Sequence, residues 1–296
     1  MYSEINNNKR KTALLIIVFI AVIFVLCWAI ASFYGEEYYF FFPFAIIFSS
    51  VMTLVSYFTG DKVALSLSGA KGPITEEQNS YVYRMVENLC ITAGIPLPRI
   101  YLIESAAINA FATGRNPQHA SIAITRGAIE KLENEELEGV IAHELSHVKN
   151  YDILVMTMVI VLVGIVSIIT NMFYRSSWRR RSSDSENKAG GILVIIGLIL
   201  IVLAPLIAQL IKLAVSRKRE YLADASGSLL TRYPEGLARA LEKIQNDNEH
   251  LDKVSEATAH LYISNPLSGK KLSRLFSTHP PIEERIKILR QMGNIK

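Results

Sequence analysis

His143-Glu144-Leu145-Ser146-His147 is a five-residue run near the middle of a chain of 296 residues. Two residues four positions apart lie on nearly the same face of an α-helix, because one turn takes about 3.6 residues. Both imidazoles can therefore bind one metal ion. Glu144 follows the first histidine and can reach a water molecule in an open coordination position of that ion. The run predicts a helix that carries a catalytic metal.

A pair of carboxylates further along the chain offers the remaining ligand. Glu220 and Asp224 are also four positions apart. One of them can bind the metal, and the other can accept a hydrogen bond from a ligating imidazole and fix its tautomer. An ordinary pair of acids on a helix surface, beside the basic residues 217–219, is the alternative interpretation. In a metalloprotease, zinc lowers the pKa of its bound water to about 7, and Glu144 would accept the proton as the scissile carbonyl is attacked.

Apolar residues are concentrated in long stretches of the sequence. Half of the chain is hydrophobic. Uncharged runs of about 20 residues are long enough for a helix to cross about 30 Å of hydrocarbon. Such predicted transmembrane helices lie at 13–33, 38–58, 153–173 and 189–211. Buried core helices are the alternative, and a cleaved signal peptide is a further alternative for the first stretch. However, core helices usually keep a polar face, and a second apolar stretch follows the first at once.

The distribution of charge predicts how the chain is oriented in the membrane. Lys9, Arg10 and Lys11 precede the first stretch, and positive charge favours the cytoplasmic side, so the N-terminus should be cytoplasmic. If the third and fourth stretches cross the membrane fully, the basic connection at 175–188 lies outside the cell, against this tendency. Each stretch is nevertheless long enough to cross, and this length favours full crossing. The net charge of +4 is mild. Nucleic acid is not an expected partner, because no nucleic-acid motif is present.

The rest of the sequence predicts one soluble domain in two parts, interrupted by a membrane hairpin. The expected units are an N-terminal tail with two membrane helices at 1–60, the first part of a cytoplasmic peptidase domain at 61–152, the hairpin at 153–211 and the second part of the domain at 212–296. Local patterns predict a helix at 75–92, strands at 99–103, 107–113 and 120–125, and helices from about 126 and 134. Asn134 should cap the last helix. No glycine or proline separates that helix from the third apolar stretch, so a continuous helix is expected.

The chain resembles a known family over essentially its whole length. The residues around the two metal-binding pairs, HELSHVKNYD at 143–152 and RKREYLAD at 217–224, are similar to the HtpX heat-shock membrane metallopeptidases, which are relatives of the CAAX prenyl endopeptidases. Further matches occur in the same order at 8–12, 108–114 and 277–286.

The resemblance implies a role for each candidate site residue. Glu220 matches the third zinc ligand of the family, and Asp224 matches the carboxylate that orients a ligand. Asn109 matches a residue on the strand beside the active site, where an extended substrate can pair with the sheet edge. His279 and Arg285 match residues near the catalytic centre, where they could stabilise the oxyanion. From the residues alone, structural roles for His279 and Arg285 stay open.

These features predict an α+β integral membrane protein with a mainly helical, zincin-like metallopeptidase domain, a small β-sheet and four transmembrane helices. We expect one Zn²⁺ per chain on His143, His147 and Glu220, with Glu144 as the general base. The resemblance implies a zinc metalloendopeptidase of the cell membrane, with its active site at the cytoplasmic face, that cleaves unfolded or misfolded membrane proteins. The alternatives are a prenyl-peptide endopeptidase and a non-catalytic zinc scaffold. An intact Glu144 argues against the scaffold.

Overall fold

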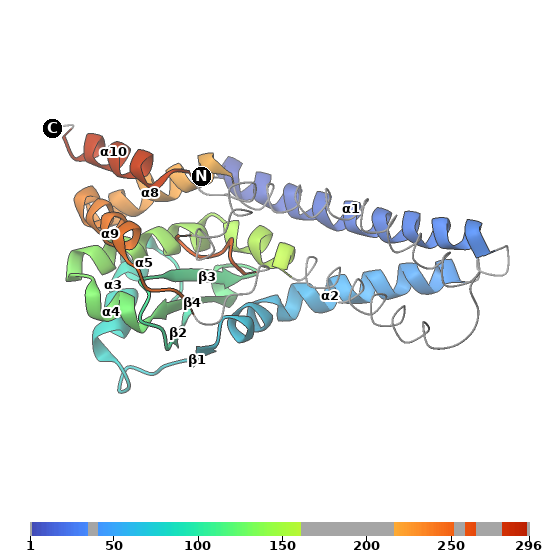
Figure 1. Cartoon of the computed structure of the whole chain (residues 1–296), viewed down its shortest axis with the longest axis horizontal. Coiled ribbons are helices and arrows are strands. Elements are labelled where there is room, and N and C mark those ends of the chain that lie inside the picture. Colours follow the sequence, from blue (N-terminus) through green and yellow to red (C-terminus); the bar gives the residue numbers. More distant parts are fainter. Residues whose placement is uncertain (1, 35–40, 161–215, 252–257, 265–279, 295–296) are drawn as a thin grey trace.

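The computed structural model describes residues 2–34, 41–160, 216–251, 258–264 and 280–294. Two long helices, α1 (Tyr2–Tyr34) and α2 (Phe41–Leu67), run side by side away from a body that holds the sheet and the other helices (Figure 1). Among the described residues, no helix is both long and apolar enough to cross a membrane. The four transmembrane helices therefore stay a prediction. Most of the predicted hairpin, its basic connection and His279 lie outside the described residues.

A mixed sheet lies at the centre of the body. Its strand order is β1-β2-β4-β3, with β2 parallel to β4 and with β1 and β3 antiparallel to their neighbours. The strands are β1 (Ala70–Lys71), β2 (Arg99–Ile103), β3 (Ala110–Gly114) and β4 (Ala120–Thr125). The predicted bounds of β2 and β4 are confirmed. β3 begins later than predicted, because the Ile108 N–H donates to the Asp247 carboxylate (2.7 Å) instead of joining a strand ladder.

Helices pack around the sheet and bring the two predicted metal-binding motifs together. They are α3 (Ser80–Ala93), α4 (Arg126–Lys131), α5 (Asn134–Lys149), α8 (Arg217–Thr231), α9 (Pro234–Asn246) and α10 (Ile282–Gly293), with a short 3-10 helix, η2 (Pro117–His119). α3 begins five residues after its predicted start, because the Asn79 side chain accepts a hydrogen bond from the Val82 N–H and caps the helix there.

The start of α5 is fixed by a capping box. Glu133 is the N-cap rather than Asn134, because Glu133 and Glu136 exchange hydrogen bonds with each other's backbone N–H groups. The helix then runs through the core, where its apolar side chains pack with those of α3, the sheet and α9; the buried set includes Val82, Ile122, Leu137, Ile141 and Leu241. Burying each such side chain stabilises the fold by about 1.5–3 kcal/mol. The core therefore fixes α5 firmly in place.

The continuous helix that the sequence predicts after α5 is interrupted. Tyr151 has a φ of 61°, and helical structure resumes at 152–160. A φ in this range is unfavourable for a residue with a side chain and must be offset by surrounding contacts. One such contact is the Asn150 carbonyl, which accepts a hydrogen bond from the Asn8 side chain at 2.9 Å. The break turns Asp152 back toward the end of α5.

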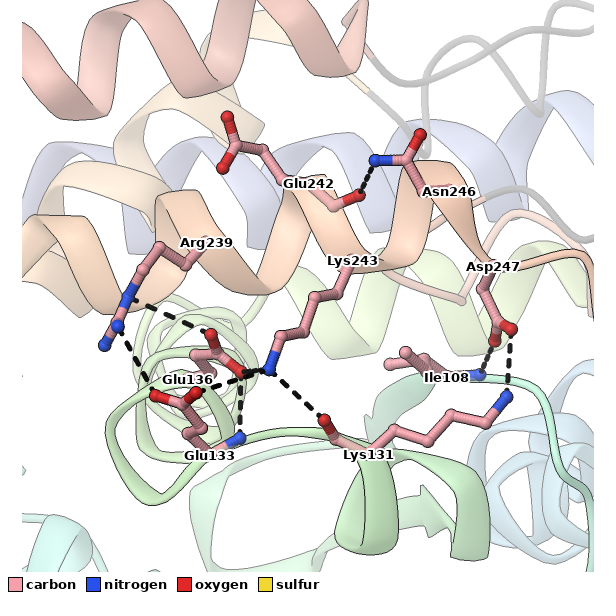
Figure 2. A pocket seen from close by; sticks show the side chains of 9 residues that line it. All are labelled: Ile108, Lys131, Glu133, Glu136, Arg239, Glu242, Lys243, Asn246 and Asp247. Atoms are coloured by element: carbon pink, nitrogen blue, oxygen red, sulfur yellow. Dashed lines mark hydrogen bonds and ion pairs between the residues drawn. The ribbon is translucent and has the colours of Figure 1, made fainter.

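A charged hollow lies between α4, α5 and α9 (Figure 2). It is lined by Ile108, Lys131, Glu133, Glu136, Arg239, Glu242, Lys243, Asn246 and Asp247. The Lys243 ammonium group lies 2.7 Å from the Glu136 carboxylate, and Lys131 donates to Asp247 at 2.9 Å. These ion pairs join α9 to the first turn of α5, and the chain after α9 to the end of α4.

Candidate metal centre

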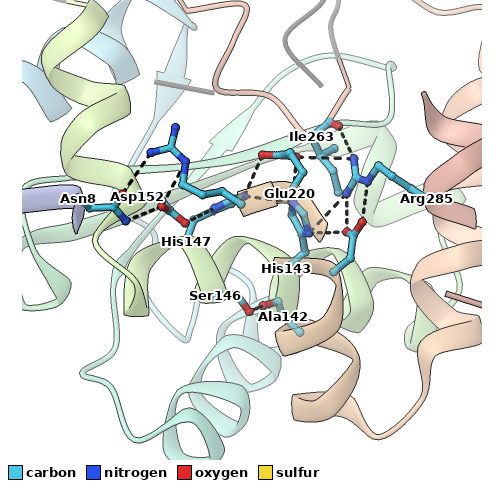
Figure 3. A network of polar contacts seen from close by, with 11 residues as sticks. Asn8, Ala142, His143, Ser146, His147, Asp152, Glu220, Ile263 and Arg285 are labelled. Atoms are coloured by element: carbon cyan, nitrogen blue, oxygen red, sulfur yellow. Dashed lines mark hydrogen bonds and ion pairs between the residues drawn. The ribbon is translucent and has the colours of Figure 1, made fainter. Parts of the chain in front are cut away.

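Helix α5 carries its two histidines and Glu144 into the interior of the body. His143, Glu144 and His147 are 1%, 2% and 4% exposed. The Nε2 atoms of the histidines face each other at 3.2 Å (Figure 3). Their rings are nearly perpendicular, with centroids 4.8 Å apart. The two imidazoles therefore direct one nitrogen each toward a common point.

Glu220 reaches the same point from α8. Its Oε1 lies 3.6 Å from His147 Nε2, and its Oε2 lies 3.8 Å from His143 Nε2. One ligand atom from each of the three residues lies within 4.8 Å of the others. Gly227 allows this approach, because a Cβ at that position would come within 3.0 Å of the His143 backbone nitrogen. A larger residue there would push α8 and its carboxylates away from α5.

Each imidazole meets an aspartate through its other nitrogen. His143 Nδ1 lies 2.9 Å from Asp224 Oδ1, and His147 Nδ1 lies 3.0 Å from Asp152 Oδ2. An Nδ1–H that donates to a carboxylate leaves the Nε2 lone pair free and makes it a stronger metal ligand. Asp224 thus lies beside His143, and its role as the carboxylate that orients a ligand stays a prediction; Asp152 is a second such aspartate, which the sequence does not predict.

Arg285 lies behind Asp224 and is fully buried. Its Nε and Nη2 donate to the two oxygens of Asp224 at 2.9 Å and 2.7 Å. This fork is the strongest geometry for an arginine and a carboxylate. Its Nη1 also donates to the Ile263 carbonyl at 3.3 Å and lies 3.9 Å from Glu220 Oε2. Arg285 therefore contacts the groups that hold the ligands, and its action on an oxyanion stays a prediction.

Burial and neighbouring charges set the protonation of the site. Burial opposes the ionised form of Asp224, but the charge and hydrogen bonds of Arg285 outweigh it and lower the pKa of Asp224 to about 2. Burial also opposes a charged His147, yet its hydrogen bond to Asp152 and nearby carboxylates raise the pKa of His147 to about 9. Burial lowers the pKa of His143. A metal ion would displace the His147 proton, because a ligating imidazole nitrogen must be deprotonated.

Glu144 lies between the histidines and the edge strand β3. Its carboxylate accepts a hydrogen bond from the Ala112 backbone N–H. Burial raises the pKa of Glu144 to about 8, although the neighbouring His147 and the Ala112 bond act in the opposite direction. A cation on the adjacent ligand atoms would lower this pKa. A carboxyl group that can gain and lose a proton near neutral pH suits general acid–base catalysis.

Asn109 lies immediately before β3. Asn109 is 5% exposed, and its Nδ2 donates to the Ser264 carbonyl at 3.1 Å. The next residue, Ala110, accepts a hydrogen bond from the Ile263 N–H at 3.1 Å. The segment around Ile263 therefore pairs with β3 at the position where the sequence predicts substrate. The role of Asn109 in substrate binding stays a prediction.

The ligand atoms suit zinc. Two nitrogens bound to one tetrahedral zinc ion at roughly 2.0–2.1 Å lie about 3.3 Å apart, and the two Nε2 atoms are 3.2 Å apart. Two imidazoles and one carboxylate are also the ligands of catalytic zinc sites, which keep a fourth position for water or substrate. Both imidazoles have the carboxylate partners that such sites use to orient them.

Three residues near the ligands are missed by the sequence reasoning. Asp152 is the last residue of the HELSHVKNYD run, and this family match is the one indication of its importance in the sequence. The continuous helix predicted there would not direct its side chain toward His147. Arg219 precedes Glu220, and its Nε lies 3.7 Å from Asp152 Oδ1. Asn8 donates to the same Asp152 oxygen at 2.7 Å from a position 144 residues away. No local pattern can indicate a contact of that separation.

Comparison with known proteins identifies the family. The model of "Peptidase family M48" matches residues 76–293, a range that includes both histidines, Glu144 and Glu220. The chain belongs to peptidase family M48. It is therefore a metalloprotease, and the cluster of His143, His147 and Glu220 could hold its metal ion. The match favours the catalytic prediction over the non-catalytic zinc scaffold.

Relatives of this M48 peptidase match it over nearly its full length. The protease HtpX homolog of Dictyoglomus turgidum is 44% identical and covers 99% of this chain and 95% of its own. That of Tropheryma whipplei (strain Twist) is 44% identical and covers 99% of each chain. That of Streptococcus uberis is 41% identical and covers 99% of this chain and 100% of its own. The predicted similarity to HtpX is confirmed.

A solved structure shares the fold of the M48 peptidase. The crystal structure of S. mikatae Ste24p matches with a TM-score of 0.50 and 19% identity, over 98% of this chain and 67% of that chain. The family match and this likeness confirm the mainly helical metallopeptidase domain with a small sheet.

Proposed function

We propose that this M48 peptidase is a membrane-bound, zinc-dependent endopeptidase. The observation that carries the proposal is the convergence of His143, His147 and Glu220 on one point, with Glu144 buried beside them. These three residues would hold one Zn²⁺ per chain. Glu144 makes the site suitable for catalysis, because a structural zinc site has four protein ligands and needs no general base.

The residues of the site would divide the work of peptide hydrolysis. Bound zinc supplies a Lewis acid that polarises the scissile carbonyl and lowers the pKa of a water molecule. Glu144 would accept the proton of that water and pass it to the leaving amine. Asp224 and Asp152 would keep His143 and His147 in the tautomer that presents Nε2 to the metal. Burial of the site strengthens each of these electrostatic contacts.

An extended peptide would pair with the outer edge of β3. Ala112 contacts Glu144 through its N–H, so a strand paired here would pass its scissile bond beside the general base. The Ala110 carbonyl would accept from the substrate in place of Ile263. Asn109→Ala should then slow cleavage of an unfolded protein without emptying the zinc site. Unchanged kinetics on both a short peptide and an unfolded protein would remove Asn109 from substrate binding.

The apolar stretches would embed the protein in the cell membrane as a multi-pass protein. Large apolar side chains on α1 and α2 are exposed, including Leu14 at 51%, Ile17 at 63%, Ile47 at 63%, Leu54 at 59% and Phe58 at 53%. Contiguous exposed apolar surface marks sites of membrane or protein contact. The lipid bilayer would be its partner. Alkaline carbonate extraction of cell membranes should leave the protein in the pellet, and release into the supernatant would contradict bilayer insertion.

The N-terminus and the metal centre would both face the cytoplasm. Asn8 donates to Asp152 at 2.7 Å, so the start of α1 and the site must lie on one side of a membrane that α1 crosses. A cysteine at Asn7, in a chain with Cys27 and Cys90 replaced by alanine, tests the orientation. A membrane-impermeant thiol reagent should label it only after the cells are opened. Labelling of intact cells would reverse the assignment.

Unfolded or misfolded membrane proteins would be the substrates, cleaved at the cytoplasmic face. The similarity to HtpX proteases suggests this class. A buried site that takes an extended strand also supports it, because a folded protein has no free strand to offer at that depth.

Casein digestion by the purified full-length protein tests the function. We expect hydrolysis that stops when a zinc chelator is added and returns when zinc is restored. Zinc content measured on the same samples should follow the activity. Casein hydrolysis that continues in protein shown to be free of zinc would contradict the proposal.

A further inference from the structure

Asn8 is buried near the start of α1, among neighbours that are exposed. It is 0% exposed, whereas the adjacent Asn6 and Asn7 face solvent. Burying an amide side chain costs free energy unless its donors and acceptor find partners. The hydrogen bonds of Asn8 therefore explain why a polar residue occupies this position.

The hydrogen-bond partners of the Asn8 side chain lie on or next to the two helices that carry the candidate metal ligands, and Figure 3 shows its contact with Asp152. Its Nδ2 donates to the Asn150 carbonyl at 2.9 Å and to Asp152 Oδ1 at 2.7 Å. Its Oδ1 accepts a hydrogen bond from Arg219 Nη1 at 3.3 Å. Asn150 ends α5, which carries both histidines, and Arg219 stands next to Glu220 on α8. One side chain of α1 thus joins the two ligand-bearing helices.

The contact with Asp152 leads directly to a ligand. Asp152 Oδ2 is hydrogen-bonded to His147 Nδ1 at 3.0 Å, and Asp152 Oδ1 accepts a hydrogen bond from Asn8 Nδ2. A carboxylate held at both oxygens cannot rotate freely about its terminal bond. The orientation of the His147 ring therefore depends on what binds the far oxygen of Asp152.

We propose that Asn8 is a positioning residue of the metal centre, which acts through Asp152 to hold the His147 imidazole ready for zinc. Loss of a group that orients a ligand typically weakens metal binding by about 10–100-fold. Asn8 lies one contact further from the metal, so we expect an effect near the lower end of that range. α1 then forms part of the active centre as well as the first apolar segment of the chain.

A purely structural role for Asn8 would give a different result. In that case Asn8 would only anchor α1 to the body, and its loss would act on zinc affinity independently of Asp152. If Asn8 acts through Asp152, the two substitutions must be non-additive, because removal of Asp152 already breaks the connection to His147. A double-mutant cycle separates the two roles.

The experiment measures zinc affinity by competition with a chromogenic chelator, on the purified full-length protein. Asn8→Ala should weaken zinc binding about tenfold. Asn7→Ala is the matched control, the same substitution one residue away on an exposed side chain, and should leave the affinity unchanged. In an Asp152→Ala background, Asn8→Ala should produce no further loss.

A second variant guards against misfolding of the first. Asn8→Asp keeps the size of the side chain, removes both donated hydrogen bonds and places a carboxylate against Asp152. Its loss of zinc affinity should be at least as large as that of Asn8→Ala. Thermal unfolding of the zinc-free variants should show a cooperative transition, which confirms that each is folded.

This inference rests on the proposed zinc site. Zinc binding by the wild-type protein distinguishes failure of the proposed function from failure of the role of Asn8. A wild-type protein that binds no zinc would refute the proposed function and the inference together. If the wild type binds zinc and either Asn8 variant binds it equally well, only the role of Asn8 is overturned. The same holds if Asn8→Ala costs the same factor with and without Asp152.

Discussion

The metal centre and the charged hollow use similar residue types in opposite surroundings (Figures 2 and 3). In the metal centre, the side chains of Arg285 and Asp224 are 0% and 1% exposed. In the hollow, the side chains of Lys243 and Lys131 are each 38% exposed. Water can replace a lost partner in the hollow but not in the metal centre. Both partners of this pair in the candidate metal centre are thus buried, whereas each of these two pairs in the hollow keeps one partner in contact with water.

The hollow also contains a buried acid, but its contacts are structural. Glu136 is 1% exposed, caps the first turn of α5 and lies 2.7 Å from Lys243. Its partners are a helix terminus and two cations with access to water, Lys243 and, at 3.9 Å, Arg239. In the metal centre, by contrast, the carboxylate of Glu220 faces two imidazole nitrogens at 3.6 Å and 3.8 Å. Only the second arrangement offers several metal-ligand atoms to one point.

The largest effect should come from the third ligand. Glu220→Ala should remove most of the bound zinc, because two imidazoles alone bind the ion weakly. Asp224→Ala should weaken binding less, by about 10–100-fold, since it removes an orienting partner rather than a ligand. Metal analysis of both variants decides the order, with Glu235→Ala as a control for an acid that is partly exposed and remote from the candidate ligands. Full zinc in Glu220→Ala, with loss in Asp224→Ala, would reverse the assignment.

The next effect concerns the buried ion pair. Arg285→Met should lower the free energy of unfolding by about 3–5 kcal/mol, because Asp224 would stay buried without its cation. Arg290→Met on the same helix is the control. Arg290 binds Glu235 and Glu242 but its side chain is 43% exposed, so about 1 kcal/mol or less is expected.

The pH dependence of this difference has a definite sign. The folded-state pKa of Asp224, about 2, is below its unfolded value. Its ionisation therefore stabilises the fold fully above about pH 4, and this contribution is lost as the pH falls toward 2. The stability difference between the wild type and Arg285→Met should shrink over that range. Chemical denaturation at several pH values measures it, and a difference that stays constant down to pH 2 would contradict the assignment.

The smallest effect should come from the hollow. Lys243→Met removes a half-exposed partner of Glu136, so the free energy of unfolding should change by about 1 kcal/mol or less, with zinc content and casein hydrolysis unchanged. Added salt should reduce this difference, because exposed pairs are screened. If Lys243→Met lost zinc as Asp224→Ala does, the distinction between the two clusters would be wrong.

Local patterns predict those features of the molecule that are set by residues close together in the sequence. β2 begins directly after Pro98, and its bounds follow from the turn before it and the alternation within it. The helical spacing of four predicts that His143 and His147 share a face, and the structure places their Nε2 atoms 3.2 Å apart.

Contacts between distant segments could not be predicted in the same way. The break at Tyr151 has no glycine or proline to announce it, so the position of Asp152 could not be read from local propensity. The family resemblance includes residues 8–12 but gives Asn8 no role, and only the fold brings Asn8 to Asp152. The candidate ligands are thus visible in the sequence, whereas two of the residues that contact them or their partners, Asp152 and Asn8, are placed only by the packed structure.

Glu144→Gln tests the central claim most directly, because it removes the general base and leaves all three ligands in place. The variant should bind as much zinc as the wild type and hydrolyse casein at least about 100-fold more slowly. Zinc content and casein hydrolysis are measured on the same preparation. A variant that keeps its zinc and cleaves casein at the wild-type rate would contradict the account.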